Sequence, residues 1–230
     1  MSGPPAIAVD GPAASGKTVV GRRLARLLGY RFLDTGAMYR AVTLLALEQG
    51  VAPDDAEGLT RIAKEMDFQT IEPTASDCEQ SGDIPRVLVN ERDVTTDVRS
   101  PRVDRTVSQV SQVPDVRNAL VGLQREIGRE GSVVMVGRDI GTVVLPDAKP
   151  KVFLEASAAV RAHRRFDEMA QHGGGTCYED VLADLRRRDK IDSERATAPL
   201  VPASDAHRVD TDSCTIDEVV ETLWRLTAKP

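Results

Sequence analysis

Gly11-Pro12-Ala13-Ala14-Ser15-Gly16-Lys17-Thr18 is the stretch of sequence that decides the fold. It matches the phosphate-loop pattern G-x-x-x-x-G-K-[ST] at every fixed position. The short apolar run at 6–9 predicts a buried strand before it, and Val20, Leu24 and Leu28 recur at helical spacing after it. A strand, a glycine loop and a helix N-terminus together aim backbone N–H groups at one point. We therefore expect this stretch to bind a phosphate.

Two side chains of the loop carry chemistry of their own. Lys17 is expected to reach the β- and γ-phosphates of a bound nucleotide, and Thr18 to place its hydroxyl on Mg²⁺. The alternative is an accidental glycine-rich turn, but the complete motif between a strand and a helix argues against it. The loop thus predicts a bound nucleotide with Mg²⁺, contacted by Gly11, Pro12, Ala13, Ala14, Ser15, Gly16, Lys17 and Thr18.

The composition is that of an ordinary globular protein, with 41% hydrophobic and 29% charged residues among 230. No run approaches the ~18 consecutive apolar residues of a membrane span. Residues 1–5 lack the basic and apolar regions of a signal peptide. The three cysteines and three histidines lie far apart, which argues against a disulfide framework and a zinc site. We therefore expect a cytoplasmic protein that does not bind membranes. We also expect a monomer, although none of these observations determines the oligomeric state.

The charge balance argues against a nucleic-acid partner. The net charge is −6, whereas general affinity for nucleic acid needs a basic binding face. Only 3% of the residues are aromatic, so few bases could stack on the protein, and a nucleic-acid-associated ATPase is disfavoured. Arginine makes up 24 of the 30 basic residues. This suits bidentate phosphate binding, but a genome rich in arginine codons explains the total at least as well.

Short apolar strands alternate with helical patterns along most of the chain. Helices are expected after the phosphate loop and near 35–45, 53–66, 100–110, 114–127, from 157 onward, 178–190 and 216–226. Strands are expected at 6–9, 31–33, 132–136, 151–154 and 207–210. This alternation predicts a three-layer α/β fold, in which helices cover both faces of a parallel sheet.

One segment departs from the alternation. Between 67 and 97 the helical period is lost, 84–90 resembles a strand, and 81–83 is a turn signal. We expect a small antiparallel sheet inserted between helices.

Charged residues follow several of the predicted parallel strands. Asp10, Asp34 and the segment 137–139 all lie at carboxyl ends of strands. Ligands of parallel sheets bind beyond these ends, so we expect the three positions to converge near the phosphate loop.

A phosphate loop alone does not distinguish a kinase from a switch GTPase or a mechanical ATPase. The Asn-Lys-x-Asp element of guanine-specific switches does not occur in the sequence. A kinase needs arginines from several loops around the transferring group, and the arginines that fit by position are Arg40, Arg138, Arg161, Arg165, Arg188 and Arg195. For any one of them the alternative is a solvated surface charge. If the helix near 178–190 persists, Arg188, Asp192 and Arg195 share a face.

Four segments, in order and spacing, closely resemble bacterial cytidylate kinases: 11–18, 33–40, 137–144 and 188–196. The similarity covers nearly the whole chain. Gly-Arg-Asp-Ile-Gly-Thr at 137–142 is much more specific than the phosphate loop. The segment near 67–97 resembles the extra small sheet of the long bacterial form of the family.

The resemblance implies a P-loop nucleoside monophosphate kinase that transfers the γ-phosphoryl of ATP directly to CMP or dCMP, with Mg²⁺. It implies a core (1–36, 130–160 and 200–230), an acceptor-binding region (37–129) and a lid (about 161–195). The glycines at 173–175 would lie in this lid, with a plain surface loop as the alternative.

The resemblance also implies roles for single residues. Arg161 would lie over adenine, and Arg165 would contact the donor phosphates. Around the acceptor, Ser108, Arg117 and Asp139 would read cytosine, and Arg188 and Asp192 would face the ribose and nearby phosphates. The acceptor phosphate would be held by Arg40, Arg138 and Arg195. Thr35 supplies a further hydroxyl at this site.

Val136 departs from the family pattern, which usually has Asp or Glu just before Gly-Arg-Asp. That acid helps to order the water shell of the metal, so we expect Asp34 or Asp10 to supply the missing charge. Two other functions remain open at this point. One is a kinase for another small acceptor, such as UMP, AMP or a hydroxy acid. The other is a nucleotide-dependent switch module without transfer chemistry.

Overall fold

The computed structural model describes residues 5–73, 85–171 and 177–228. The chain divides into two compact units, one formed by residues 1–34 and 124–230 and the other by residues 35–123. The expected turn at 81–83 and the glycines at 173–175 lie outside the described residues. Within the part of the chain that is described, no helix is long and apolar enough to cross a bilayer.

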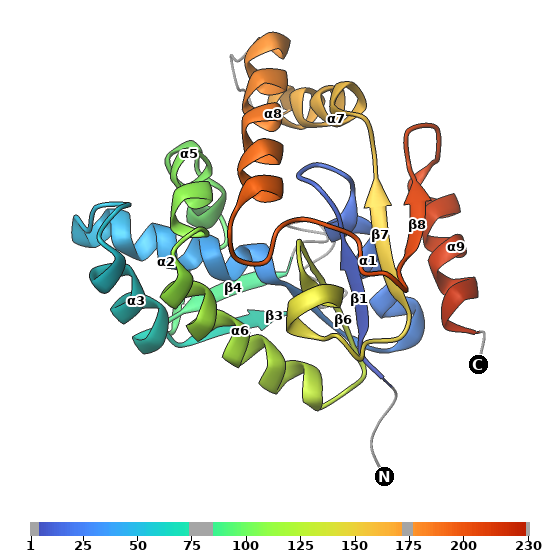
Figure 1. Ribbon diagram of the computed structural model, residues 1–230, viewed down its shortest axis with the longest axis horizontal. Coiled ribbons are helices and arrows are strands. Elements are labelled where there is room, and N and C mark those ends of the chain that lie inside the picture. Colours follow the sequence, from blue (N-terminus) through green and yellow to red (C-terminus); the bar gives the residue numbers. More distant parts are fainter. Residues whose placement is uncertain (1–4, 74–84, 172–176, 229–230) are drawn as a thin grey trace. The chain divides into compact units, whose positions relative to one another are not determined.

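The first unit contains a parallel sheet of five strands in the order β2-β6-β1-β7-β8 (Figure 1). Every neighbouring pair runs parallel, which confirms the predicted α/β class. The strands are β1 (Ile7–Asp10), β2 (Arg31–Asp34), β6 (Val133–Gly137), β7 (Lys151–Glu155) and β8 (His207–Asp210). All five were expected from the sequence, with ends displaced by one residue at most.

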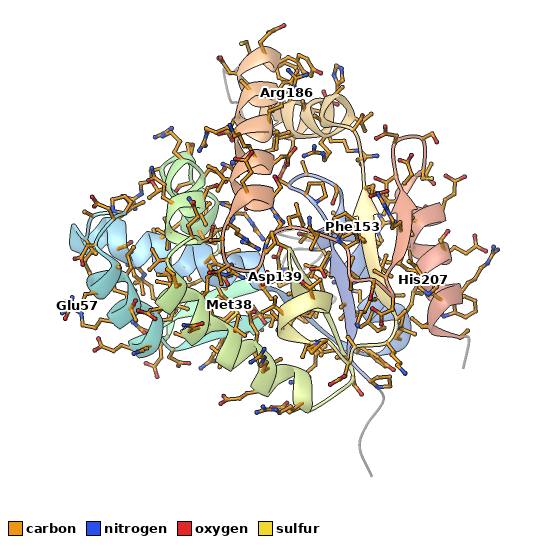
Figure 2. The ribbon with its side chains drawn as sticks, in the orientation of Figure 1. Met38, Glu57, Asp139, Phe153, Arg186 and His207 are labelled. Atoms are coloured by element: carbon orange, nitrogen blue, oxygen red, sulfur yellow. The ribbon has the colours of Figure 1, made fainter. Side chains whose placement is uncertain are left out.

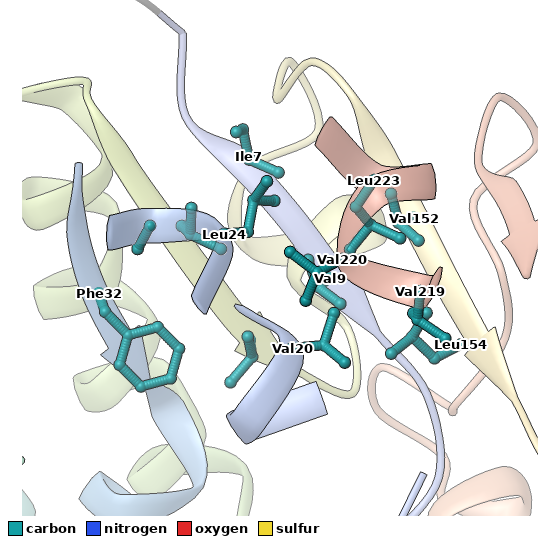
Figure 3. Close-up of a cluster of buried hydrophobic side chains, with 13 residues drawn as sticks. Ile7, Val9, Val20, Leu24, Phe32, Val152, Leu154, Val219, Val220 and Leu223 are labelled. Atoms are coloured by element: carbon teal, nitrogen blue, oxygen red, sulfur yellow. The ribbon is translucent and has the colours of Figure 1, made fainter. Parts of the chain in front are cut away.

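The helices of this unit include α1 (Lys17–Leu28) and α9 (Ile216–Thr227), which pack against each other. Their apolar faces meet the sheet in one buried cluster that contains Ile7, Leu24, Val152 and Leu223 (Figure 3). Three further helical elements are α7 (Ala158–Gln171), α8 (Tyr178–Glu194) and the short turn η2 (Ile140–Val144). α7 begins just beyond the carboxyl end of β7, and α8 packs against it (Figure 1). The loops at the carboxyl ends of the strands therefore stand on a buried apolar base.

The phosphate loop joins β1 to α1 by a turn that depends on glycine. Gly11 has φ +149°, and a Cβ built there would lie 2.3 Å from the carbonyl oxygen of Leu154 in β7. Gly16, which caps α1, has φ +89°. A side chain at position 11 would collide with backbone, so the loop can cross β7 closely only because this position is glycine.

The second unit consists of helices and the inserted sheet. The helices are α2 (Thr35–Gln49), α3 (Ala56–Glu65), the short η1 (Asp97–Arg99) and α5 (Pro101–Val110), and α6 (Pro114–Arg129) begins here. Pro101 and Pro114 are the first residues of their helices, where a missing N–H is harmless. α3 begins later than predicted, because the Asp55 side chain accepts from the N–H of Gly58 and caps the helix there.

The predicted antiparallel insertion is confirmed. It has three strands, β3 (Phe68–Ile71), β4 (Arg86–Val89) and β5 (Arg92–Asp93), in the order β3-β4-β5. Val87 and Val89 of β4 are buried, and the residues that alternate with them are less so. This one-sided pattern is typical of an antiparallel sheet with one packed face.

Candidate active site

Lys17 is enclosed by its own loop. Its Nζ donates to the carbonyl oxygen of Pro12 at 2.5 Å and contacts the Ser15 hydroxyl at 3.3 Å. Burial and the repulsion of Arg138 hold the pKa of Lys17 well below its ordinary value, although Asp34 and Asp10 act in the opposite direction. An anion in the loop would favour the charged ammonium, so phosphate binding and protonation of Lys17 support each other.

Thr18 and Asp34 form a pair beside the loop. The Thr18 hydroxyl donates to Oδ2 of Asp34, the last residue of β2, at 2.8 Å. Because this hydroxyl gives its proton to Asp34, its oxygen lone pairs remain available to a metal ion. The pair supplies hard oxygen donors, which Mg²⁺ prefers. The described residues contain no group of three or more His, Cys, Asp or Glu side chains that could hold a metal. The Thr18 hydroxyl and the Asp34 carboxylate are few ligands, but they fit Mg²⁺, because this ion takes most of its ligands from phosphates and water.

Asp10, the last residue of β1, holds the loop that follows β6. Its two carboxylate oxygens accept the backbone N–H groups of Ile140 and Gly141, each at 2.8 Å. Burial raises the pKa of Asp10 to about 6, and the two N–H donors and Lys17 only partly oppose this, while Asp139 adds to it. The carboxylate therefore fixes the backbone directly after Arg138 and Asp139.

Two ion pairs connect this loop to the end of α8. Arg138 Nε donates to Asp192 Oδ2 at 2.8 Å, and Arg195 Nη2 donates to Asp139 Oδ1 at 3.4 Å. Asp139 and Arg195 are both buried. Asp139 lies just beyond the end of β6 (Figure 2). Asp192 favours the charged form of Arg138 enough to raise its pKa against the opposing effect of burial. The predicted convergence of strand ends near the phosphate loop is thus present within the first unit.

The common face expected for Arg188 and Arg195 required the helix to continue through Arg195, and it does not. α8 ends at Glu194, and Arg195 has extended backbone, so its side chain leaves the helix and donates from Nε to the carbonyl oxygen of Ala198. Arg188 lies on the helix and pairs through Nε with Asp184 at 2.8 Å. Asp192 is brought to Arg138 instead. Asp192 and Arg195 are therefore brought to Arg138 and Asp139 by tertiary contacts and not by helical spacing.

The two arginines expected at the donor lie on α7. Arg161 is buried and donates from Nε to the Ala156 carbonyl, from Nη1 to the Ala13 carbonyl at 3.2 Å, and from Nη1 and Nη2 to both carboxylate oxygens of Asp189. Arg165 is partly exposed and pairs with Glu168 one turn along. Contact of Arg161 with adenine stays a prediction.

The acceptor residues of the second unit form a group of their own. Arg40 donates to the Val98 carbonyl at 3.0 Å and to Asp104 Oδ1 at 2.5 Å. The Arg117 guanidinium lies 5.6 Å from the centre of the Tyr39 ring. Buried polar side chains in this unit include Thr35, Ser108 and Arg117. Thr35 is the first residue of α2, and the helix carries Arg40 from there.

The carboxylates that accompany these arginines were not predicted from the sequence. All six arginines singled out by position pair with an Asp or Glu: Arg40–Asp104, Arg138–Asp192, Arg161–Asp189, Arg165–Glu168, Arg188–Asp184 and Arg195–Asp139. The i,i+3 and i,i+4 pairs on α7 and α8 could have been found from helical spacing. No spacing links Arg161 to Asp189, 28 residues away, or Arg40 to Asp104, 64 residues away.

Comparisons with known proteins identify the family of the chain. The sequence model of the cytidylate kinase family matches residues 7–229. A cytidylate kinase of Mycolicibacterium paratuberculosis is 49% identical over 97% of this chain and 95% of its own length. One from Caldanaerobacter subterraneus subsp. tengcongensis is 44% identical over 97% of this chain and 94% of its own. A bifunctional pantoate ligase/cytidylate kinase of Synechococcus sp. matches 96% of this chain at 47% identity, over 40% of its own length. The chain therefore belongs to the cytidylate kinase family.

Proposed function

We propose that the protein transfers the γ-phosphoryl group of ATP to CMP or dCMP, giving ADP and CDP or dCDP. The observation that carries this is the position of Arg138 and Asp139 at the end of β6, which pairs with β1, the strand that leads into the phosphate loop. Relatives that are 44–49% identical along nearly their whole length carry the name cytidylate kinase, which supports the choice of acceptor.

The reaction is an in-line displacement without a covalent enzyme intermediate. A phosphate oxygen of CMP attacks the γ-phosphorus while the bond to the β-phosphate oxygen breaks, and ADP leaves. The acceptor phosphate is already an anion, so no strong general base is needed. The protein contributes position and positive charge. Backbone N–H groups of the phosphate loop and Lys17 hold the donor, with Arg165 at its phosphates and Arg161 near adenine.

The acceptor side divides the same task among several arginines. Arg40, Arg138 and Arg195 hold the CMP phosphate, and Arg188 with Asp192 faces the ribose. Cytosine is read by Ser108, Arg117 and Asp139, because a carboxylate is the natural acceptor for the exocyclic amino group. Thr35 adds a hydroxyl to this side. The buried pair of Asp139 and Arg195 supports the proposal, since it joins a base-reading group to a phosphate-holding group.

Mg²⁺ would be held by the Thr18 hydroxyl, with Asp34 ordering the surrounding water. Bound there with ATP, the ion neutralises charge on the β- and γ-phosphates. Asp34 suits this role better than Asp10, because both oxygens of Asp10 already accept backbone N–H groups. Val136 offers no charge, and its side chain is buried in the apolar cluster between α1 and the sheet.

Replacing Asp34 tests the metal assignment. In Asp34→Asn we expect the Mg²⁺ concentration for half-maximal activity to rise severalfold, because the amide no longer carries the charge that favours the hydrated ion. Titration of Mg²⁺ at saturating nucleotide measures this, with Glu221→Gln on the outer face of α9 as the control for a lost surface carboxylate. An unchanged Mg²⁺ dependence in Asp34→Asn would remove Asp34 from the metal site.

The acceptor is tested by offering CMP, dCMP, UMP, AMP and shikimate with ATP and identifying the phosphorylated product. We expect CDP and dCDP as the main products. Preferential use of UMP, AMP or shikimate would point to a kinase of another acceptor. ATP binding or hydrolysis without any phosphorylated acceptor would instead point to a switch module. We further infer a cytoplasmic monomer whose partners are these nucleotides and not nucleic acid or membrane, in line with the net charge of −6.

A further inference from the structure

Arg161 links three segments of the first unit. Its guanidinium donates to the carbonyl oxygen of Ala13 in the phosphate loop and, as a bidentate fork, to both oxygens of Asp189 on α8, at 3.0 and 2.6 Å. Its Nε donates to Ala156, between β7 and α7, at 2.9 Å. Only about 5% of the Arg161 side chain is exposed, whereas 27% of Asp189 is. The fork has one geometry, so Asp189 determines where this buried guanidinium lies.

The phosphate loop also packs against α7 and α8. Ala13 and Ala14 contact a cluster built on Ala162, Val181 and Leu185. Ala14 has φ +59°, a left-handed backbone that residues with a Cβ adopt rarely. Such a conformation persists only where its surroundings hold it. The two helices therefore contact the loop twice, through the apolar cluster beside Ala14 and through the hydrogen bond to the neighbouring Ala13.

We propose that Asp189 is a positioning residue for the donor nucleotide. By holding Arg161 against the Ala13 carbonyl, it couples the placement of α8 to the conformation of the phosphate loop. If α8 moves away from α7, the fork opens and the loop loses a contact beside its strained residue. If the fork is closed, the loop is kept in the shape that receives phosphates. The inference rests on the proposed use of ATP and adds a residue outside the phosphate loop on which donor binding depends.

The test uses Asp189→Asn, Arg161→Lys and the double variant in the full chain. In Asp189→Asn the side-chain amide N–H group faces an N–H group of the Arg161 guanidinium, so one of the two hydrogen bonds is lost. In Arg161→Lys the ammonium cannot form the bidentate pair. Each change therefore disrupts the same contact. We expect each single variant to raise the KM for ATP by about tenfold, with the KM for CMP changed less than about twofold. The double variant should be no worse than either single one, because the two residues act through each other.

Inorganic tripolyphosphate serves as a probe that lacks adenine. Its inhibition constant against ATP should rise in Asp189→Asn by the same factor as the KM for ATP, because the defect lies in the phosphate loop. Glu221→Gln, a carboxylate of an exposed pair on α9, is the control and should change none of these constants. Thermal unfolding of each variant identifies any that fails to fold. If Asp189→Asn does not fold, the KM for ATP and the inhibition constant for tripolyphosphate are measured in Arg161→Lys.

Three results would overturn the proposal. One is an unchanged KM for ATP in folded Asp189→Asn. Another is a raised KM for ATP with an unchanged inhibition constant for tripolyphosphate, which would indicate a contact with adenine alone. The third is additivity of the two substitutions. Failure of the wild type to phosphorylate CMP at all would contradict the proposed function, and it is measured first.

Discussion

At the scale of single residues, burial shifts the pKa values of Lys17 and Asp10 in opposite directions: it lowers that of Lys17 and raises that of Asp10. Both lose solvent, so both are pushed toward their neutral forms. A bound phosphate would stabilise the charged form of Lys17. The charged form of Asp10 is stabilised by hydrogen bonds from two backbone N–H groups and by the charge of Lys17.

Removing the ammonium should therefore affect turnover strongly. We expect Lys17→Ala to lower kcat by on the order of 10²–10⁴, the range seen when one preorganised electrostatic group is deleted from an active site. Steady-state kinetics with saturating ATP and CMP measure this, and Lys64→Ala on the exposed side of α3 is the control. Full activity in Lys17→Ala would contradict the assignment of the phosphate loop.

The stability contributed by Asp10 should depend on pH in the direction opposite to that of a salt-bridged carboxylate. Its pKa is about 6 in the folded protein and 3.8 as the reference value, so between these values the folded state binds more protons than the unfolded state. Its contribution is present below about pH 4 and is lost as the pH rises through about 6. The total change is about 3 kcal/mol at 1.36 kcal/mol per pKa unit.

Urea unfolding of the wild type and Asp10→Asn at several pH values checks this. We expect the free energy of unfolding of the wild type, relative to the variant, to fall between pH 4.5 and 6.5 and to stay level above pH 7. A difference that is constant over the whole range would show that Asp10 does not titrate there.

At the scale of elements, α1 packs against the sheet more closely than a side chain at position 21 allows. A Cβ built on Gly21 would lie 2.5 Å from Cγ1 of Val136 in β6 and 3.2 Å from the Phe32 ring. Gly122 on α6 is the matched control, since a Cβ there meets nothing within 4 Å.

We expect Gly21→Ala to lower the free energy of unfolding by about 1–2 kcal/mol, because overpacking outweighs the better helix propensity of alanine. Gly122→Ala should instead raise it by up to about 1 kcal/mol. Chemical denaturation measures both, and equal stabilisation by the two substitutions would mean that α1 can move away from β6 without cost.

Element types were predictable because their patterns are local. The phosphate-loop motif determines a strand, a turn and a helix in one stretch, and the loss of helical period after residue 67 indicated the antiparallel insertion.

The end of α8 was not predictable. Neither Gly nor Pro occurs until Pro199, and the helix stops at Glu194 where Arg195 turns to Asp139 and the Ala198 carbonyl. A long-range contact there overrides local preference.

At the scale of the whole molecule, the sequence could not supply the strand order or the partners of the charges. β6 lies between β2 and β1, although about a hundred residues separate it from either in the chain. Nothing in a single sequence marks which strands become neighbours. For the same reason the site residues could be named from motifs and resemblance, whereas Asp189 and Asp104 emerged only from the arrangement in space.

The pairing of all six arginines singled out by position with a carboxylate has a consequence for how nucleotides would arrive. Dipoles of opposed charges separated by 2.5–3.4 Å produce a field that fades within a few ångströms, unlike an array of uncompensated cations. Nucleotides would not be drawn in from a distance. Capture should proceed by exchange, one anion replacing another at contact range, and the association rate constant should vary little with ionic strength.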